Sequence, residues 1–200
     1  MILNKTEFIM MNNPFRAIIQ KYFEAFILNK MGGTVNGGHA LEIGCGRGVG
    51  AEIIIEKFGA KTVDAFDLDP RMIELAQKRL KKYNNRVRIW VGDATEIIAK
   101  DSVYDAVFDF GIIHHIPDWQ NAVSEVFRVL KPGGRFFTEE LFRNVINNPF
   151  VAKLLDHPQS TQFDDEEFKL ALVKAGFALV NSNKLLNCIG WYVADKALED

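Results

Sequence analysis

Cysteine is scarce in this sequence, and a long uncharged apolar run is missing. The two cysteines among the 200 residues, Cys45 and Cys188, lie far apart and show no CxxC or cysteine/histidine spacing. This shortage argues against a disulfide framework and a structural zinc site, and we expect a reducing cytoplasm as the setting. Charged residues such as Lys5, Glu7 and Arg16 interrupt the N-terminal part. We therefore expect neither a transmembrane segment, which needs roughly 20 apolar residues, nor a cleavable signal peptide.

A strong excess of charge of one sign is also missing. The formal net charge is −2, which gives no general attraction to nucleic acids or to an anionic membrane. A length of 200 residues fits one domain, 1–200, with a real core. A cluster of basic residues is expected to form a solvated face and not a nucleic-acid track: Lys78, Arg79, Lys81, Lys82, Arg86 and Arg88.

Strands and helices are predicted to alternate along the chain. Apolar residues recur at helical spacing from Pro14 to the glycines at 32 and 33. Further helices are expected at 51–58, 70–83, 119–130 and 165–175, and strands at 39–43, 62–66, 87–91, 106–110 and 135–138, followed by an antiparallel pair at 177–184 and 189–195. This alternation predicts a doubly wound α/β fold with a mostly parallel sheet. Ligands of such sheets bind at the carboxyl ends of the strands.

A glycine-rich loop follows the first predicted strand. Gly44, Gly46, Gly48 and Gly50 stand at alternate positions around Cys45, directly before a predicted helix. Glycine lets the backbone come close to a ligand, and the helix start offers unpaired N–H groups. The spacing is not specific, because residues 46–51 also satisfy a relaxed dinucleotide fingerprint. A NAD site therefore stays open at this point.

Acidic residues at successive strand ends help to separate the cofactors. Asp67, after the second strand, can accept both hydroxyls of an adenosine ribose, which NAD and S-adenosylmethionine share. Leu68 can pack on the adenine, Asp93 can accept from its amino group, and the Ala94 backbone N–H can donate to its ring. Glu42 precedes the glycines and would repel a pyrophosphate, whereas it suits a ligand that bears an ammonium and a sulfonium. Asp93 is also compatible with a simple turn cap.

Several stretches together resemble the class I S-adenosylmethionine-dependent methyltransferases, in the small-molecule branch that includes quinone methylases (methyltransferase type 11). The matching stretches are 40–48, 66–72, 92–94, 104–109, 113–119 and 125–134. The resemblance implies a Rossmann-like seven-stranded sheet of order 3-2-1-4-5-7-6 with strand seven antiparallel. It also implies that backbone around 109–111 approaches the methionine end of the cofactor. The cofactor-binding residues expected are Glu42, Gly44, Cys45, Gly46, Gly48, Asp67, Leu68, Asp93, Ala94, Asp109 and Phe110.

Candidate bases follow the fourth and fifth strands. A base is needed only where the methyl acceptor must lose a proton, and no metal is required or visible. The tentative catalytic residues are Asp109, at the strand end, and the neighbouring His114 and His115. Of Glu139 and Glu140, only one is expected to enter the pocket, because neighbouring strand residues face opposite ways. His157 is a weaker candidate.

Two segments outside the 39–140 core are candidates for acceptor specificity. They are the N-terminal helical extension, 1–34, and an insertion at 141–163, in which 149–155 are compatible with a short helix; the helix and strand pair of 164–200 complete the domain. One hypothesis is a lid around an apolar acceptor, lined by Phe8, Met11, Phe15, Phe142, Phe150 and Phe163. The alternative is an N-terminal helix that simply covers the sheet.

The sequence thus predicts a cytoplasmic methyltransferase. It would transfer a methyl group from S-adenosyl-L-methionine to O, N or C of a partly apolar small molecule and release S-adenosyl-L-homocysteine. A NAD-dependent oxidoreductase on a related fold and a non-catalytic cofactor-binding protein are the alternatives. The acceptor and the oligomeric state are left open.

Overall fold

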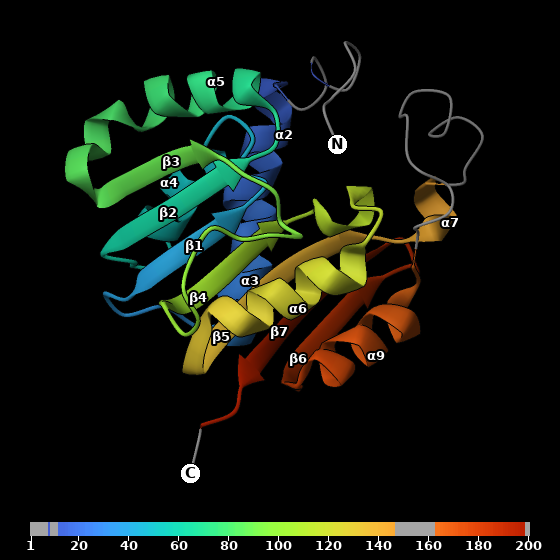
Figure 1. Cartoon of the computed structure of the whole chain (residues 1–200). Helices are drawn as coiled ribbons and strands as arrows, with labels where there is room; N and C mark the ends of the chain where they lie inside the picture. Colours follow the sequence, from blue (N-terminus) through green and yellow to red (C-terminus); the bar gives the residue numbers. More distant parts are fainter. Residues whose placement is uncertain (1–7, 9–11, 147–162, 199–200) are drawn as a thin grey trace.

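A seven-stranded mixed sheet forms the centre of the molecule. The computed structural model describes residues 8, 12–146 and 163–198. The strands are β1 (His39–Ile43), β2 (Thr62–Asp67), β3 (Val87–Val91), β4 (Tyr104–Phe110), β5 (Leu130–Leu141), β6 (Phe177–Leu185) and β7 (Ile189–Lys196). Their order is β3-β2-β1-β4-β5-β7-β6, with β7 antiparallel to both neighbours. The predicted fold and strand order are confirmed (Figure 1).

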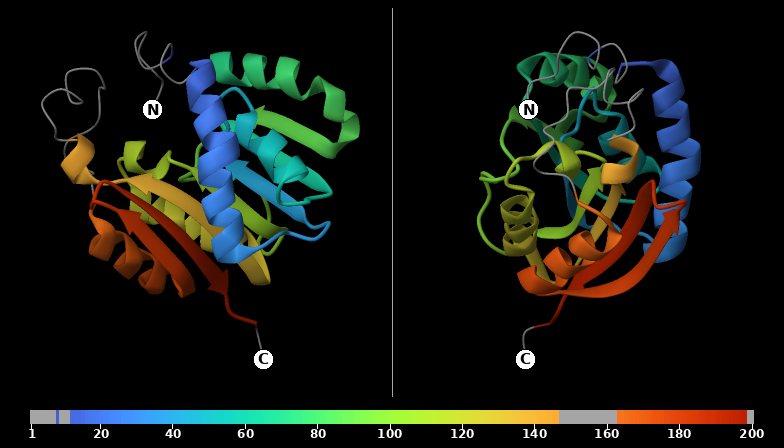
Figure 2. Two further views of the ribbon diagram at one scale, coloured as in Figure 1. Left: turned by 180° about the vertical axis from the view of Figure 1, so that it is seen from behind. Right: turned by 90° about the vertical axis from the view of Figure 1, so that its right-hand side faces the viewer.

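Helices cover both faces of this sheet. They are α2 (Pro14–Ile19), η1 (Gln20–Glu24), α3 (Ala25–Gly32), α4 (Val49–Glu56), α5 (Pro70–Leu80), η2 (Lys81–Arg86), η3 (Ile113–His115), α6 (Trp119–Val129), α7 (Arg143–Ile146) and α9 (Asp165–Ala175). One core joins the sheet to α3, α4 and α5, and another joins it to α6 and α9. Figures 1 and 2 show these two layers from opposite sides. Among the described residues, no helix is long and apolar enough to cross a membrane.

The N-terminal helical segment runs from Pro14 to Gly32 as α2, η1 and α3 without a break. Asn13 starts it, since its side chain accepts from the Phe15 backbone N–H at 2.9 Å, and a proline at the first helical position suits this start. The middle turn, η1, is a π-helix. The helix predicted from apolar spacing is therefore present, with one turn wound more widely.

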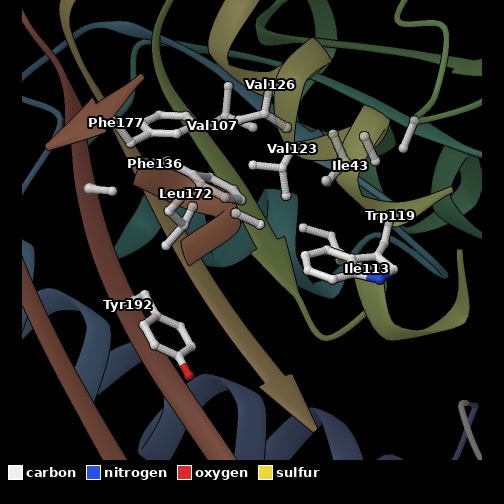
Figure 3. Close-up of a cluster of buried hydrophobic side chains, with 14 of the residues drawn as sticks. Ile43, Val107, Ile113, Trp119, Val123, Val126, Phe136, Leu172, Phe177 and Tyr192 are labelled. Carbon is white, nitrogen blue, oxygen red and sulfur yellow. The ribbon is translucent and has the colours of Figure 1, made fainter. Parts of the chain in front are cut away.

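The core on the α6 and α9 side takes up residues that the lid hypothesis had assigned to the acceptor. Phe142 and Phe163 are each 1% exposed and belong to this core, which Figure 3 shows around Phe136 and Trp119. The Phe163 ring centroid lies 4.6 Å from that of Trp119. The prediction that Phe142 and Phe163 line a lid is wrong, because β5 continues to Leu141 and leads the chain back over the core. Met11, Phe150, His157 and the stretch 149–155 lie outside the described residues.

Strand β5 is longer than its predicted core of 135–138. Its first residue, Leu130, pairs with Tyr104, and the register shifts before Arg135 pairs with Ala106. At its other end, antiparallel pairing with β7 extends β5 to Leu141. Helix α6 ends at Val129, and Gly133 and Gly134 lie within β5, which pairs with both neighbouring strands from Arg135 onward.

Candidate active site

A cavity of about 550 Å³ opens at the carboxyl ends of β1, β2 and β4 and is bordered by α2. This is the edge of a doubly wound sheet where ligands bind, and the volume suits a small molecule. The lining residues are Arg16, Ala17, Gln20, Glu42, Gly44, Cys45, Gly46, Arg47, Val49, Phe66, Asp67, Leu68, Met72, Gly92, Asp93, Ala94, Thr95, Phe110, Ile112, His115, Ile116, Pro117 and Asp118. Nine of the eleven predicted cofactor residues are among them, including Phe110. The two that are absent are Gly48 and Asp109.

The glycine loop is tied to β2 by backbone hydrogen bonds. The Cys45 N–H donates to the Phe66 carbonyl at 2.8 Å, and the Gly46 N–H donates to Asp67 Oδ2 at 2.8 Å. Gly46 has a φ of 51° and no neighbouring atom within 4 Å of where a Cβ would stand, so the space beside it is open. Gly48 lies outside the cavity lining, and a Cβ there would meet Leu80 at 2.7 Å. Gly48 thus serves helix packing, and its predicted contact with a cofactor is not supported.

Glu42 is the most unusual group in the cavity wall. The residue is 2% exposed, and its Oε2 has no hydrogen-bond partner among the residues that the structure describes. Glycine at position 50 makes room for the carboxylate, because a Cβ there would lie 1.8 Å from Glu42 Oε1. Burial raises the pKa of Glu42 well above its usual range, and the nearby Asp67 and Asp109 add to the rise. A buried acceptor without a partner is costly, so this oxygen is suited to a donor or cation that a ligand brings.

Asp67 links the glycine loop to the start of α5. Its Oδ2 accepts from Gly46, and its Oδ1 accepts from the Asp69 backbone N–H at 2.9 Å. Burial raises the pKa of Asp67, while these two backbone donors oppose the rise. Each carboxylate oxygen keeps capacity for a second donor, such as a ribose hydroxyl. The helix cap is the other acid, Asp69, which accepts from the Arg71 backbone N–H at 2.9 Å, as predicted.

The third strand end contributes a turn. Asp93 Oδ1 accepts from the backbone N–H and the hydroxyl of Thr95, both at 2.8 Å. Asp93 therefore caps a turn and also lines the cavity, so both interpretations of this residue fit its position. Ala94 is 5% exposed and Leu68 is 37% exposed, and both lie in the cavity wall.

Asp109 does not reach the cavity. It is fully buried, with Oδ1 accepting from the Ile112 N–H at 2.9 Å and Oδ2 from the Thr138 hydroxyl at 2.7 Å. Burial and the neighbouring Glu140 raise its pKa well above the usual range. Strand alternation explains the error in the prediction, because Phe110 faces the cavity side and Asp109 the opposite side of β4.

The two histidines after β4 have different surroundings. His114 is 2% exposed, and its Nδ1 lies 2.5 Å from Glu140 Oε2. His115 lines the cavity, and its ring centroid lies 4.2 Å from that of His114. Glu140 also accepts from the backbone N–H groups of Ile113 and His114, at 2.8 and 3.2 Å, and so fixes η3. Among the three tentative catalytic residues, only His115 faces the cavity.

Neither carboxylate at the end of β5 enters the cavity, which corrects the expectation that one of them does. Burial raises the pKa of Glu140 to about 7. Glu139 is 3% exposed and accepts from Trp191 Nε1 at 2.5 Å on the other face of the sheet. Within the described residues, no group of three or more histidine, cysteine or acidic side chains could hold a metal ion.

Several cavity residues were not assigned a role from the sequence, among them Arg16, Gln20 and Arg47. Arg16 and Gln20 on the N-terminal helical segment line the cavity, one helical turn apart. Arg47 donates to the backbone carbonyls of Asn12 and Asn13 at 2.7 and 2.9 Å, and so attaches the start of α2 to the glycine loop. No local signal distinguishes Arg16 and Gln20 from the other polar residues of this helix, such as Lys21 and Glu24.

The N-terminal segment covers the sheet and also borders the cavity, while its role as a lid stays a prediction. Its α2 part borders the cavity, whereas α3 packs on the sheet through Leu28. The predicted lid residues Phe8 and Phe15 are absent from the cavity lining. The Phe8 ring centroid lies 4.9 Å from the Arg71 guanidinium, and Phe15 is 72% exposed.

Comparison with known proteins finds similarity to methyltransferases. Residues 40–134 match the family described as "Methyltransferase domain". A demethylmenaquinone methyltransferase of Leptospira interrogans is 34% identical over 125 residues, 59% of this chain and 48% of that protein. A ubiquinone biosynthesis O-methyltransferase of Coxiella burnetii is 30% identical over 133 residues, 66% and 52% of the two chains. Phosphoethanolamine N-methyltransferase 2 of Caenorhabditis elegans is 34% identical over 110 residues, 54% and 25% of the two chains. The matches thus span a quarter to about half the length of these relatives.

Solved structures agree on the fold. A SAM-dependent methyltransferase from Aquifex aeolicus superposes with a TM-score of 0.77 at 18% identity, over 97% of this chain and 99% of that one. A putative methyltransferase of Haloferax volcanii, in complex with a Trm112 activator, gives 0.79 at 15% identity, over 92% and 93%. A [4+2]-cyclase also superposes, with a TM-score of 0.74 at 15% identity, over 88% of this chain and 80% of that one. The fold alone therefore does not determine the reaction.

Proposed function

We propose that this chain is a class I S-adenosylmethionine-dependent methyltransferase and that it transfers a methyl group to O, N or C of a partly apolar small molecule. S-adenosyl-L-methionine is the donor in this proposal, and S-adenosyl-L-homocysteine is the product. The reaction takes place in the cavity at the carboxyl edge of the sheet. The sparse, widely separated cysteines favour the cytoplasm as its location.

The observation that carries the proposal is the unpartnered, buried Oε2 of Glu42 in the cavity wall. The donor bears an ammonium and a sulfonium and has no phosphate, so it suits this carboxylate. A dinucleotide would bring a pyrophosphate toward the same acid, and like charges in a buried site repel strongly. Glu42 therefore favours the methyl donor over NAD.

The chain supplies a complete set of groups for this donor. Glu42 would receive the ammonium, Asp67 the ribose hydroxyls, and Asp93 with the Ala94 backbone N–H the adenine. Leu68 and Phe110 provide apolar walls. When bound, the donor supplies a methyl group that its sulfonium has already activated. The work left to the protein is alignment of the acceptor and exclusion of water.

His115 is the group we assign to proton removal. Its side chain lies in the cavity wall, and a neutral imidazole can accept a proton from a hydroxyl, an amine or an acidic carbon of the acceptor. His114 and Glu140 act behind it, since their buried pair holds the η3 turn that presents His115.

Much of the cavity wall is apolar. Phe66, Met72, Ile112, Ile116 and Pro117 are among its apolar lining residues. This supports an acceptor with an apolar portion. Relatives named for demethylmenaquinone and ubiquinone biosynthesis are consistent with that class. The N-methyltransferase among the relatives is the reason why the methylated atom is left as O, N or C.

Titration calorimetry with S-adenosylhomocysteine and with NADH tests the cofactor. We expect S-adenosylhomocysteine to bind, and Asp67→Ala to weaken it about tenfold or more, because charged hydrogen bonds to the ribose are lost. Asp101→Ala is the matched control, since the Asp101 side chain is 76% exposed and lies outside the cavity. Binding of NADH without binding of S-adenosylhomocysteine would contradict the proposal. Transfer of a labelled methyl group in an acceptor screen separates an enzyme from a non-catalytic binding protein.

A further inference from the structure

The outward face of the N-terminal helical segment is apolar. Six large side chains recur there at helical spacing and are 72%, 54%, 49%, 67%, 50% and 60% exposed, in the order Phe15, Ile18, Ile19, Tyr22, Phe23 and Phe26. We call them the outer stripe. Figure 2, left, shows this helix, in blue, lying outermost on its face of the molecule. Single exposed apolar residues are ordinary, but a contiguous row of this size marks an interaction surface.

Most of the outer stripe is not needed for the helix's own packing; the exception is Phe23, whose ring packs edge-on against the buried Trp191 with the centroids 6.1 Å apart. The opposite face of the helix is buried by Ala25, Leu28 and Gly32, which lie against the sheet and α4. Ordinary surface helices direct their apolar stripe inward and their polar side chains outward. Here the inward face of the first two turns instead holds polar groups, with Arg16 and Gln20 at the cavity. Apart from Phe23, the outer stripe is therefore additional apolar surface beyond what the fold uses.

The charged groups beside the outer stripe that lack an ion-pair partner among the described residues are lysines, whereas the nearby acid Glu56 is paired with Lys21 at 2.9 Å. Lys30 Nζ lies 5.8 Å from the Phe26 ring centroid, and Lys57 Nζ lies 6.0 Å from that of Tyr22. Neither lysine forms an ion pair with any residue that the structure describes. The helix has a single acidic residue, Glu24, which is 4% exposed and bonded to Arg16 at 2.6 Å. A partner for this surface must accept apolar side chains and lysine ammonium groups together.

We propose that the outer stripe, with Lys30 and Lys57, docks this protein on the surface of an anionic lipid bilayer. Aromatic and aliphatic side chains would enter the boundary between headgroups and acyl chains, and the lysines would reach anionic headgroups. A second copy of the chain fits less well. A two-fold contact through the outer stripe would bring Lys30 and Lys57 of both copies close together, and no free acidic side chain of the described helix would balance their charges.

The position of the helix gives this docking a consequence for the cavity. Arg16, Ala17 and Gln20 belong to the same helix and form one wall of the cavity. Docking would therefore place the cavity beside the lipid surface, where an apolar acceptor is concentrated. This consequence rests on the proposed function, whereas lipid binding itself does not.

Co-sedimentation of the full chain with phosphatidylcholine vesicles, with and without phosphatidylserine, tests the docking. We expect sedimentation with the anionic vesicles and less of it at high salt. The double variant Tyr22→Gln and Phe26→Gln should lower the partition coefficient about tenfold or more, because two apolar anchors are lost. Lys30→Gln with Lys57→Gln should remove most of the preference for phosphatidylserine.

The chain offers a matched control on its other face. Leu170 and Val173 on α9 are 52% and 58% exposed, so Leu170→Gln with Val173→Gln removes similar apolar surface away from the outer stripe. This control should sediment like the unaltered chain. Unaltered binding of the Tyr22/Phe26 variant, or no binding of the unaltered chain, would overturn the docking. So would a concentration-dependent dimer in sedimentation velocity that the same variant abolishes.

Calorimetry with S-adenosylhomocysteine on these variants separates the two proposals. Retained ligand binding shows that the Tyr22/Phe26 variant is folded and that its loss of lipid binding is specific. A protein that binds S-adenosylhomocysteine but no vesicle refutes the docking alone. A protein that binds vesicles through the outer stripe but no S-adenosylhomocysteine refutes the cofactor assignment alone.

Discussion

Glu42 is a carboxylate held out of water beside an open cavity, and ionising it in the free protein is expensive. Burial is the main reason why its pKa lies well above the usual range, and the backbone amide of Ala51 offsets only part of the rise. The folded state therefore binds a proton that the unfolded chain has released. The corresponding stability is fully present below the ordinary glutamate pKa and is lost as pH rises through the raised value. A cation that reaches Oε2 would reverse this preference for the protonated form.

Glu42→Gln tests both the cost of burying this carboxylate and its role in binding the ligand. The amide stays neutral, so the free energy of unfolding should fall less from acidic to alkaline pH than in the unaltered chain, as measured by denaturant titrations. The same variant should bind S-adenosylhomocysteine about tenfold more weakly or worse, because the ammonium loses its charged partner.

A neighbouring acid controls for general charge effects in this experiment. Glu96→Gln removes an exposed carboxylate that follows the same strand end as Asp93 and is absent from the cavity lining. It should change neither the pH dependence nor the affinity. Equal effects of the two substitutions would mean that Glu42 acts only through the net charge of the site.

At the scale of elements, the start of α2 is held to the glycine loop by one side chain. Arg47 donates to the carbonyls of Asn12 and Asn13, and the Asn13 carbonyl also accepts from the Arg16 N–H of α2 at 3.1 Å. Removal of the Arg47 guanidinium takes away the donor that Asn12 has among the described residues and one of the two donors to Asn13, and so frees one wall of the cavity. The contact couples the N-terminal segment to the ligand site.

Arg47→Ala should therefore loosen α2 while leaving the rest of the fold intact. We expect faster hydrogen exchange at the amides of 15–20, and weaker S-adenosylhomocysteine binding by roughly tenfold, since ordering the wall then opposes binding. Amides of α9, on the other side of the sheet, serve as the internal control. Unchanged exchange in α2 would show that helix packing, and not Arg47, holds the wall.

The elements themselves could be predicted from the sequence, because their signals are local. Asn13 before Pro14 and Asp69 before Pro70 mark helix starts, and the structure has both caps. Side-chain direction at strand ends is not local. Asp109 faces away from the cavity because the register of β4 decides which of two neighbouring residues faces α4. Apolar residues occur at both odd and even positions of β4, so the sequence alone does not indicate this register.

Contacts between distant segments were beyond sequence reasoning for a similar reason. The length of β5 depends on pairing with β7, some fifty residues away, and this pairing draws Phe142 into the core. Cavity residues on α2 were missed because nothing local indicates which sheet edge the helix crosses. The glycine loop, Asp67 and Asp93 were placed correctly at the cavity, since each follows directly from a strand end.

At the scale of the whole molecule, the cavity draws on only part of the chain. Its described lining lies between Arg16 and Asp118, and α9, β6 and β7 contribute nothing to it. The sheet nevertheless continues without a break from β4 through β5 to β7. If this continuity makes folding cooperative, a ligand that binds at β1 and β2 must also stabilise the distant strands, because all of them unfold together.

Native-state hydrogen exchange with and without S-adenosylhomocysteine measures that cooperativity. At about 100 times its dissociation constant, the ligand adds about 2.7 kcal/mol to the free energy of global unfolding. We expect the slowest amides of β1, which borders the cavity, and of β7, which does not, to gain this protection equally. A gain in β1 with none in β7 would divide the sheet between β4 and β7 into separate unfolding units. Because β7 pairs with β5 along seven residues and also borders the core under α3, its opening exposes that core, and a single unit is the outcome that the structure favours.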